Sequence, residues 1–314
     1  MNEINPKSEA ADWDDNHRSG VVAVIGKPNV GKSSLINAIL GQKIAIVSPK
    51  PQTTRRQQLG ILTDARGQIM FVDTPGLHKP FNKLGEYMQQ VAESAVRDAD
   101  ILLWILDASE APQTPDQIIA KRLGEIAPKT PLLLVLNKYD LVKPEMDPQA
   151  HLDLIAHQES FRVSATRGDN VEQLVNRLFD LLPIGPRYYP EDQLSDQNMR
   201  FIAAETIRES VILNTEQEIP YSVAVSIERF KETEERTVIE AIIYVERDSQ
   251  KGIVIGKGGQ MIQKIGTLAR QNLMQIMEMP VHLELHVKVL KDWRSNPDYM
   301  RRFGYRAPRP GEED

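Results

Sequence analysis

The first stretch that could do chemistry follows the apolar run 21–25 and has the spacing G-x-x-x-x-G-K-S from Gly26 to Ser33. Glycines let main-chain N–H groups curl around phosphate oxygens, and a helix beginning here adds its positive end. Lys32 can neutralise β- and γ-phosphate oxygens, and the Ser33 hydroxyl can bind Mg²⁺. The pattern predicts a phosphate-binding loop (P-loop), whose nucleotide-binding residues are Gly26, Lys27, Pro28, Asn29, Val30, Gly31, Lys32, Ser33 and Ser34.

Two further segments supply groups for a metal-bound triphosphate. The tetrapeptide 73–76 follows the apolar run 69–72, so Asp73 could hold a Mg²⁺-bound water and Gly76 could offer its N–H to the γ-phosphate. The segment 49–55 is polar, aperiodic and interrupted by prolines, as expected of a loop that orders around Mg²⁺ and a γ-phosphate. Thr53 or Thr54 of this loop is the expected second metal ligand, and the sequence alone leaves both open.

A third segment selects the base. Asn137-Lys138-Tyr139-Asp140 follows the apolar run 132–136. The Asp140 carboxylate can accept from guanine N1–H and N2–H₂, a donor pair that adenine lacks, while Asn137 braces the loop. Ser164 and Ala165 would complete the base pocket through main-chain contacts. These residues favour GTP over ATP.

The elements that position these groups follow a β-α-β rhythm. Short apolar runs at 21–25, 69–72, 101–106, 132–136 and 161–163 alternate with stretches of helical periodicity at 33–40, 85–97 and 171–182. This order predicts an α/β fold with a doubly wound, mostly parallel sheet. The alternating run 59–63, just before Ile69, predicts a hairpin that adds an antiparallel edge strand.

Three prolines and a glycine between Pro183 and Pro190 end the last helix and mark a domain boundary. Beyond it the predicted order is α-β-β-α-α-β, with a helix at 198–213, strands at 221–229, 238–246 and 281–289, and a long helix from Gln260. This predicts a smaller α+β domain. The predicted organisation is a disordered acidic tail (1–18), a nucleotide-binding domain (19–183), a linker (184–197), the second domain (198–295) and a basic C-terminal segment (296–314).

The chemical signal of the second domain is the turn Ile255-Gly256-Lys257-Gly258-Gly259, which is predicted to lie after a strand and before the helix that begins at Gln260. A G-x-x-G turn lets the backbone of single-stranded RNA approach closely, and a nearby lysine can contact phosphate. Between 247 and 270 five cationic residues face one carboxylate, Asp248, in a chain whose net charge is −6. The predicted RNA-binding residues are Ile255, Gly256, Lys257, Gly258, Gly259, Lys251 and Lys264; a purely structural turn is the alternative.

Composition sets wider limits. The 314 residues suffice for two domains with cores, and 41% hydrophobic with 26% charged residues is ordinary for a folded protein. The absence of cysteine excludes disulfides, thiolate metal sites and a cysteine nucleophile. The longest apolar runs are far shorter than the ~20 residues that span a bilayer, and the N-terminus lacks a basic export signal. A cytosolic protein is expected.

Taken together, the P-loop, Thr53-Thr54-Arg55, Asp73-Thr74-Pro75-Gly76-Leu77, Asn137-Lys138-Tyr139-Asp140 and Ser164-Ala165 resemble, in this order, the translation-factor-like GTPases and within them the Era family. One such GTPase domain followed by one type II KH domain narrows the resemblance, which covers residues 20–295. It implies Thr54 rather than Thr53 as the metal ligand. Under it the catalytic residues are Lys32, Thr54 and Gly76; the metal ligands are Ser33, Thr54 and Asp73; and the GTP-binding residues beyond the P-loop are Asp73, Thr74, Pro75, Gly76, Asn137, Lys138, Asp140, Ser164 and Ala165.

The same resemblance implies an Mg²⁺-dependent GTPase that binds the 3′ end of 16S rRNA during maturation of the small (30S) ribosomal subunit. It further implies a cytoplasmic monomer with peripheral contact to the inner membrane. Leu77 stands where many Ras-like GTPases have a water-orienting glutamine, so slow intrinsic hydrolysis is expected. His78 follows Leu77 and is a weak candidate for a general base. Asn29 could hold a K⁺ ion against the phosphates.

Three alternatives remain open at this level. Hydrolysis could be incidental to a nucleotide-sensing RNA scaffold, or the P-loop could serve an ATP-using enzyme, which conflicts with Asp140. The third concerns the C-terminal segment, where Trp293 and Tyr299 lie among arginines and lysines. This mixture could contact RNA or an anionic membrane, or the segment could simply dock on the protein.

Overall fold

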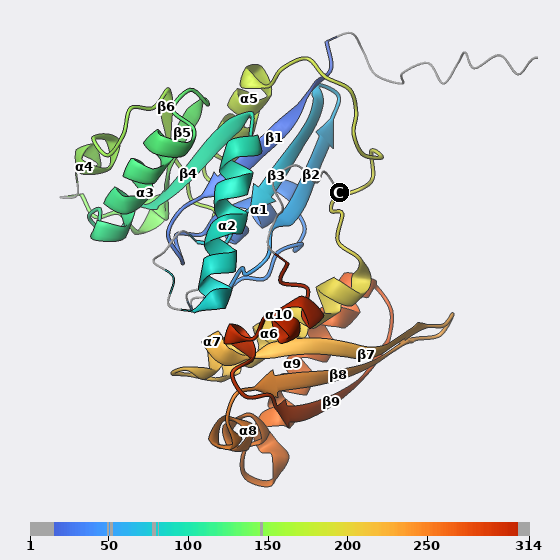
Figure 1. Cartoon of the computed structure of the whole chain (residues 1–314). Helices are drawn as coiled ribbons and strands as arrows, with labels where there is room; N and C mark the ends of the chain where they lie inside the picture. The colour runs from blue at the N-terminus through green and yellow to red at the C-terminus, as the bar shows by residue number, and fades with distance from the viewer. Residues whose placement is uncertain are drawn as a thin grey trace, which may run out of the picture.

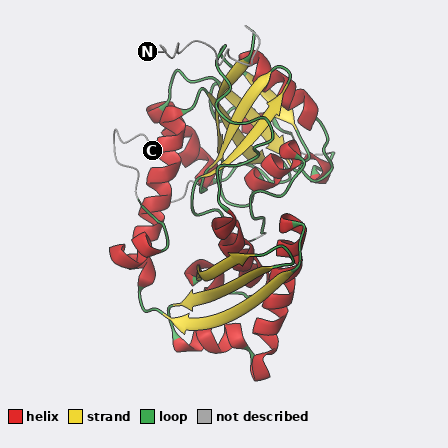
Figure 2. Cartoon of the chain, turned by 90° about the vertical axis from the view of Figure 1, so that its right-hand side faces the viewer, coloured by secondary structure: helices red, strands yellow, loops and turns green. Residues whose placement is uncertain are grey.

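The computed structural model describes residues 16–48, 50, 53–76, 80, 82–144 and 147–306. Its two sheets lie in separate parts of the molecule, one above the other (Figures 1 and 2). Leu77 and His78, the acidic residues 1–15 and the end of the basic tail lie outside the described residues.

The larger sheet has the strand order β2-β3-β1-β4-β5-β6. All neighbours are parallel except β2 and β3, which form an antiparallel hairpin at the sheet edge. Both the mostly parallel sheet and its antiparallel edge strand are as predicted. The strands are β1 (Arg18–Ile25), β2 (Gln58–Asp64), β3 (Gly67–Asp73), β4 (Ile101–Asp107), β5 (Leu132–Asn137) and β6 (Glu159–Arg162).

Helices cover both faces of this sheet. One apolar core joins Leu35 and Leu174 to one face of the strands, and a second joins Ala92 and Ile119 to the other. A parallel sheet covered on both faces explains why β3, β4 and β5 are continuous buried runs rather than alternating ones. The helices are α1 (Lys32–Leu40), α2 (Lys83–Asp98), α3 (Thr114–Ile126), α4 (Gln149–Leu152) and α5 (Val171–Leu181), with a 3₁₀ turn η1 (Tyr139–Leu141).

The start of β1 and the linker lie together at one end of the larger sheet. Arg18, predicted as the end of a solvated tail, is the first residue of β1, because it pairs with Gly67 and bridges to Ile184. The buried amide of Gln68 accepts from Tyr188 N and Tyr189 N, both at 2.9 Å, and donates to Tyr189 O. The linker is therefore tied to the sheet, a feature that its prolines did not predict.

The second unit has the strand order β7-β8-β9, with β8 and β9 parallel, and its helices share one core with the sheet. The α-β-β-α-α-β order is present. The predicted strand at 221–229 starts too early: Ile219 and Pro220 begin a short helix that includes Tyr221, and the strand starts at Ala224. The elements are α6 (Met199–Asn214), α7 (Ile219–Ser222), β7 (Ala224–Glu232), β8 (Thr237–Val245), α8 (Asp248–Ile255), η2 (Lys257–Gly259), α9 (Gln260–Met277) and β9 (Val281–Val289).

The C-terminal segment packs between the two units. It contains η3 (Trp293–Ser295) and α10 (Pro297–Arg302). Trp293 has no exposed surface, donates from its indole N–H to Ser222 O at 2.7 Å, and packs with Tyr305 in a cluster that includes Tyr87 of α2. Trp293 is thus a docking residue, and its indole is closed to RNA or lipid. Within the described residues no helix is long and apolar enough to cross a membrane.

Candidate nucleotide site and RNA-binding turn

The P-loop connects β1 to α1, and two of its glycines are required by geometry. Gly31 has φ +97°, and a Cβ there would lie 2.3 Å from the Asn137 side-chain nitrogen. Gly26 closely approaches Ile105, whose carbonyl oxygen would lie 2.5 Å from an added Cβ. The P-loop main chain can therefore approach Ile105 of β4 and Asn137 of β5 this closely only without side chains at these two positions.

Lys32 lies inside this loop. Its buried ammonium donates to the carbonyls of Gly26 and Lys27, both at 3.1 Å. Burial lowers the pKa of Lys32 to about 8, against the opposing attraction of Asp73. These contacts hold the cation at the centre of the loop that would surround the phosphates.

Three oxygen groups meet at the mouth of the loop. Ser33 Oγ donates to Asp73 Oδ2 at 2.6 Å, and Thr54 Oγ1 donates to the same oxygen at 3.2 Å. Asp73 Oδ1 is buried and has no hydrogen-bond partner within the described chain, and burial raises the pKa of this carboxyl against the effect of Lys32. Clustered hydroxyl and carboxylate oxygens suit Mg²⁺, so the residues fit that ion.

The same geometry separates the two threonines. Thr53 Oγ1 turns away and donates to Lys50 O at 2.7 Å. Thr54, by contrast, is buried beside Ser33. The structure therefore places Thr54, and not Thr53, at the candidate metal site.

The 73–76 segment follows β3 and lies against the P-loop. An added Cβ on Gly76 would lie 2.9 Å from Pro28 N, and Gly76 lines a pocket together with Asn29, Lys32 and Ser33. The Thr74 hydroxyl instead donates to Val24 O at 2.8 Å, so its side chain holds the loop to β1. The Thr74 side chain therefore stabilises the loop, a structural contact that the prediction of Thr74 as a GTP-binding residue did not include.

Asn137 joins the candidate base pocket to the P-loop. Its side-chain nitrogen donates to Val30 O at 2.7 Å, and its oxygen accepts from Ala165 N at 3.0 Å. Ser164 Oγ donates to Asp140 Oδ1 at 2.7 Å, which orients that carboxylate. The predicted members of the base pocket thus come together at the ends of β5 and β6.

Two lysines of the predicted site are held by carboxylates that the sequence analysis missed. Lys27 Nζ pairs with Glu110 at 2.8 Å and with buried Asp116 at 3.0 Å. Burial would lower the pKa of Lys27, but these pairs outweigh it and raise the pKa. Lys138 Nζ pairs with Asp107 at 2.5 Å. The two carboxylates therefore neutralise the Lys27 ammonium. Its main chain, whose carbonyl accepts from Lys32, is the part of Lys27 that faces the inside of the P-loop.

The turn 256–259 lies between α8 and α9, so a helix and not the predicted strand precedes it, and it uses left-handed backbone. Gly258 and Gly259 have φ +60° and +81°, and an added Cβ at either would meet no atom of the described residues within 4 Å. Lys257 is exposed and Lys251 is half-buried on the adjoining helix, while Ile255 packs against the core. The turn thus presents open main chain beside a cation, as a phosphate-contacting turn requires.

One set of contacts escaped the sequence analysis altogether. The loop that carries Thr54 is bonded to the second unit: Arg208 donates to Thr53 O, and buried Arg55 donates to Val223 O at 2.6 Å and Pro220 O at 2.9 Å. Lys50 donates to Ile212 O at 2.7 Å and to Thr215 O at the end of α6. These contacts tie the candidate metal loop directly to α6 and α7.

Comparisons with known proteins agree with this architecture. The family model described as 50S ribosome-binding GTPase matches residues 21–138, and that of the KH domain matches residues 218–294. GTPase Era of Lacticaseibacillus paracasei is 47% identical over 293 residues, covering 92% of this chain and 97% of the relative. A solved Era in complex with MgGDPNP and nucleotides 1506–1542 of 16S ribosomal RNA has a TM-score of 0.86 at 39% identity. A variant of Aquifex aeolicus Era bound to GDP·AlF₄⁻ has a TM-score of 0.85 at 40% identity. Each alignment covers 92% of this chain and 99% of the solved one.

The fold and the site define a P-loop GTPase that carries a C-terminal KH domain. The extent of the likeness goes further, since it runs through both domains and the segment between them. The chain belongs to the GTPase Era family and is a GTP-hydrolysing enzyme.

Proposed function

We propose that this GTPase is a switch that binds the 3′ part of 16S rRNA through its KH domain and acts in small-subunit assembly. The observation that carries the proposal is the bonding of the Thr54 loop to α6 and α7. If this loop rearranges around a γ-phosphate and Mg²⁺, its hydrogen bonds to α6 and α7 would have to break or change partners. Further support comes from the related Era solved with nucleotides 1506–1542 of 16S rRNA.

The roles of the site residues follow from their positions. Asp140 reads the guanine, Lys32 neutralises the β- and γ-phosphates, and the main-chain N–H of Gly76 faces the γ-phosphate. Ser33, Thr54 and Asp73 would hold Mg²⁺, which would supply positive charge against the negative charge that develops on the phosphate oxygens. Asp73 Oδ1 is buried and has no hydrogen-bond partner among the described residues, which supports a further ligand or water at this point.

In the KH domain, Gly256, Lys257, Gly258 and Gly259 would clamp the RNA backbone, with Lys251 and Lys264 adding charge. We place the bounds of the two domains at 18–183 and 198–295, the first one residue earlier than predicted because Arg18 begins β1. Finer parts of the proposal are K⁺ at Asn29, a monomeric state, a cytoplasmic location, and contact of the exposed Arg301 and Arg306 with the inner membrane. Asn29 supports the first point because it lines the pocket beside Ser33.

The test is single-turnover GTP hydrolysis with and without RNA spanning nucleotides 1506–1542, paired with RNA affinity in the presence of GDP or a non-hydrolysable GTP analogue. A switch requires reciprocal coupling, so the nucleotide that tightens RNA binding must itself bind more tightly when RNA is present. Gly258→Asp is the control, because a carboxylate at the phosphate position should weaken RNA binding by about tenfold while intrinsic hydrolysis stays unchanged. RNA affinity that is the same in both nucleotide states would instead indicate a scaffold in which hydrolysis is incidental.

A further inference from the structure

The segment 107–116 leads from β4 to α3 and contacts both nucleotide-binding loops. Its first residue, Asp107, is the last of β4 and pairs with Asn137 of β5. The main-chain N–H of Ala108 donates to Asn137 O at 2.9 Å. Asp116, at the other end, lies in the first turn of α3. The segment therefore starts beside the candidate base pocket and ends at a contact with the P-loop.

Asp107 holds the loop that carries Asp140. Its Oδ2 accepts from Lys138 Nζ at 2.5 Å, and its Oδ1 accepts from the N–H and the hydroxyl of Ser109 at 3.0 and 2.6 Å. Burial would raise the pKa of Asp107, but the hydrogen bonds from Lys138 and Ser109 outweigh it and lower the pKa. Lys138 has φ +59°, a conformation that few side chains adopt without support from their surroundings. The ion pair therefore fixes a strained residue two positions before Asp140.

Asp116 holds the P-loop. It has no exposed surface, and its Oδ2 accepts from Lys27 Nζ at 3.0 Å and from Gln113 N at 2.8 Å. Glu110 also pairs with Lys27, but its side chain is 42% exposed. The carbonyl of Lys27 accepts from Lys32 Nζ at 3.1 Å. Asp116 therefore fixes the residue whose main chain holds the ammonium expected to bind the phosphates.

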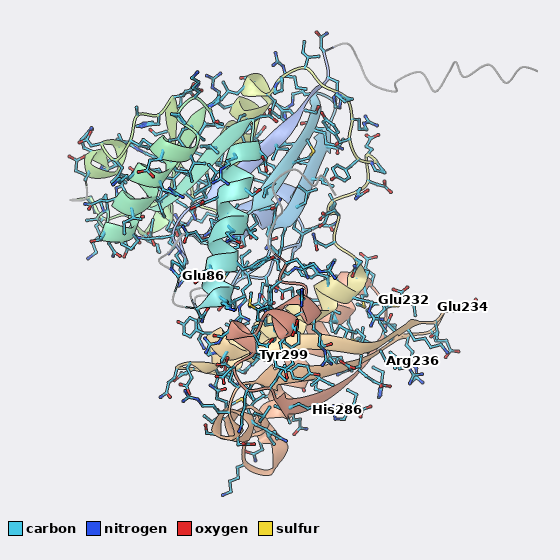
Figure 3. All side chains as sticks on the ribbon, in the orientation of Figure 1. Glu86, Glu232, Glu234, Arg236, His286 and Tyr299 are labelled. Carbon is cyan, nitrogen blue, oxygen red and sulfur yellow. The ribbon has the colours of Figure 1, made fainter. Side chains whose placement is uncertain are left out.

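These two carboxylates differ from the exposed carboxylates of the chain. Figure 3 shows Glu232 and Glu234 at the far tip of the β7–β8 hairpin, where both residues are exposed. Water screens such charges, so their removal costs little. Asp107 and Asp116 are only 8% and 0% exposed. A lysine whose buried carboxylate loses its charge is driven toward water, and its loop must move with it.

We propose that Asp107 and Asp116 are positioning residues for nucleotide binding: Asp107 holds the guanine-reading loop in place, and Asp116 holds the phosphate-binding loop. The inference rests on the proposed roles of Asp140 and Lys32 and deepens them. It gives the two carboxylates different tasks. Losing the Asp116 charge weakens binding of the phosphates whatever the base is, whereas losing the Asp107 charge weakens discrimination between bases. A purely structural role for the segment predicts no such division.

The test measures the affinity of the full chain for GDP and for inosine diphosphate, whose base lacks the 2-amino donor. Competition with a fluorescent GDP analogue gives both values for each variant. Asp116→Asn keeps the shape and an acceptor for Gln113 N, and it should weaken both nucleotides by about tenfold without changing their ratio. Asp107→Asn should lower the preference for GDP by about tenfold, the lower end of what one hydrogen bond to a charged group is worth.

Glu125→Gln is the matched control, because Glu125 is a half-exposed carboxylate of α3 that pairs with Arg122 at 3.1 Å. It should change neither affinity. A double-mutant cycle of Lys27→Met with Asp116→Asn tests whether Asp116 acts through Lys27. The double variant should bind GDP about as weakly as the weaker single variant, whereas losses that add up would overturn that route.

Unchanged binding in Asp116→Asn would overturn the positioning role of that residue. An unchanged GDP preference in Asp107→Asn would do the same for Asp107, as would losses in Glu125→Gln that match those of the two variants. Asp140→Asn separates this inference from the assignment beneath it, because it should abolish the preference for GDP over inosine diphosphate. If it does not, the proposed reading of guanine by Asp140 is wrong; if it does while Asp107→Asn has no effect, only the positioning role is wrong.

Discussion

The guanidinium of Arg55 donates to the main-chain oxygen of Val223 at 2.6 Å, across the boundary between the GTPase and KH domains. Arg55 is 1% exposed, also donates to Pro220 O and lies 5.8 Å from the ring of Trp293. Its neighbour in the chain is Thr54, whose hydroxyl lies at the candidate metal site. Arg55 therefore links the candidate metal ligand Thr54, its neighbour in the chain, to the main chain of the KH domain.

Replacing Arg55 should uncouple the two domains. Arg55→Met keeps much of the side-chain length but leaves two buried carbonyls without donors, at a cost of about 1–3 kcal/mol for each. We expect a lower melting temperature and a loss of the difference in RNA affinity between the GDP and GTP-analogue states, while GTP hydrolysis is retained. Calorimetry and RNA titrations in both states measure this. Arg97→Met, which removes an exposed arginine paired within α2, should preserve the difference in RNA affinity.

Substituting the two threonines should identify the metal ligand. Thr54→Ala removes the hydroxyl that lies 3.2 Å from Asp73, so Mg²⁺-dependent hydrolysis should fall by at least about tenfold, as even indirect metal partners can cost that much. Thr53→Ala removes only a bond to Lys50 O and should retain most of the activity. Hydrolysis rates across an Mg²⁺ titration measure both. A larger loss in Thr53→Ala would reverse the assignment.

Asp140→Asn should change the base that is bound. Two hydrogen bonds from guanine to a carboxylate are worth about 1.5–3 kcal/mol each, so GTP affinity should fall by about a hundredfold or more. Affinity for xanthosine triphosphate should rise, because its base presents an acceptor at position 2. Competition binding with both nucleotides measures the exchange. Asp153→Asn, an exposed control outside the pocket, should change neither affinity; equal binding of ATP and GTP by the unmodified protein would refute the assignment of Asp140.

Potassium should accelerate hydrolysis if Asn29 holds that ion beside the phosphates. A cation placed there would stabilise the negative charge that develops on the phosphates, as an arginine finger does in other GTPases. The rate in KCl should therefore exceed that in NaCl by at least about tenfold at equal ionic strength. Asn29 has φ +67°, which glycine accepts without strain, so Asn29→Gly should remove the preference while keeping affinity for GDP. Stopped-flow phosphate release measures the rates. Identical rates in the two salts would leave the missing catalytic group to RNA or a protein partner.

The local parts of the nucleotide site could be predicted because each is a short motif at the end of a strand. The P-loop follows β1, and Asp73 and Asn137 are the last residues of β3 and β5, so all three lie where the carboxyl ends of parallel strands meet. Strand and helix periodicity placed most elements within a few residues. Periodicity failed at the start of β7, which was predicted three residues too early. The single helical turn that begins at Ile219 is too short to show a helical period in the sequence.

The sequence by itself determined which chemistry each motif can do, because the candidate phosphate-binding backbone, the carboxylate proposed to read guanine and the G-x-x-G turn are each set by residues adjacent in the chain. Tertiary structure decided which distant groups meet them. Thr53 and Thr54 are adjacent residues of the same type, and only the packing of their loop brings Thr54 to Asp73. For Trp293 the sequence left contact with RNA, contact with a membrane and docking on the protein open, and the bond to the buried Ser222 carbonyl decides for docking. Arg55 and Val223 are 168 residues apart, and such pairings depend on the relative placement of two domains, which no local pattern encodes.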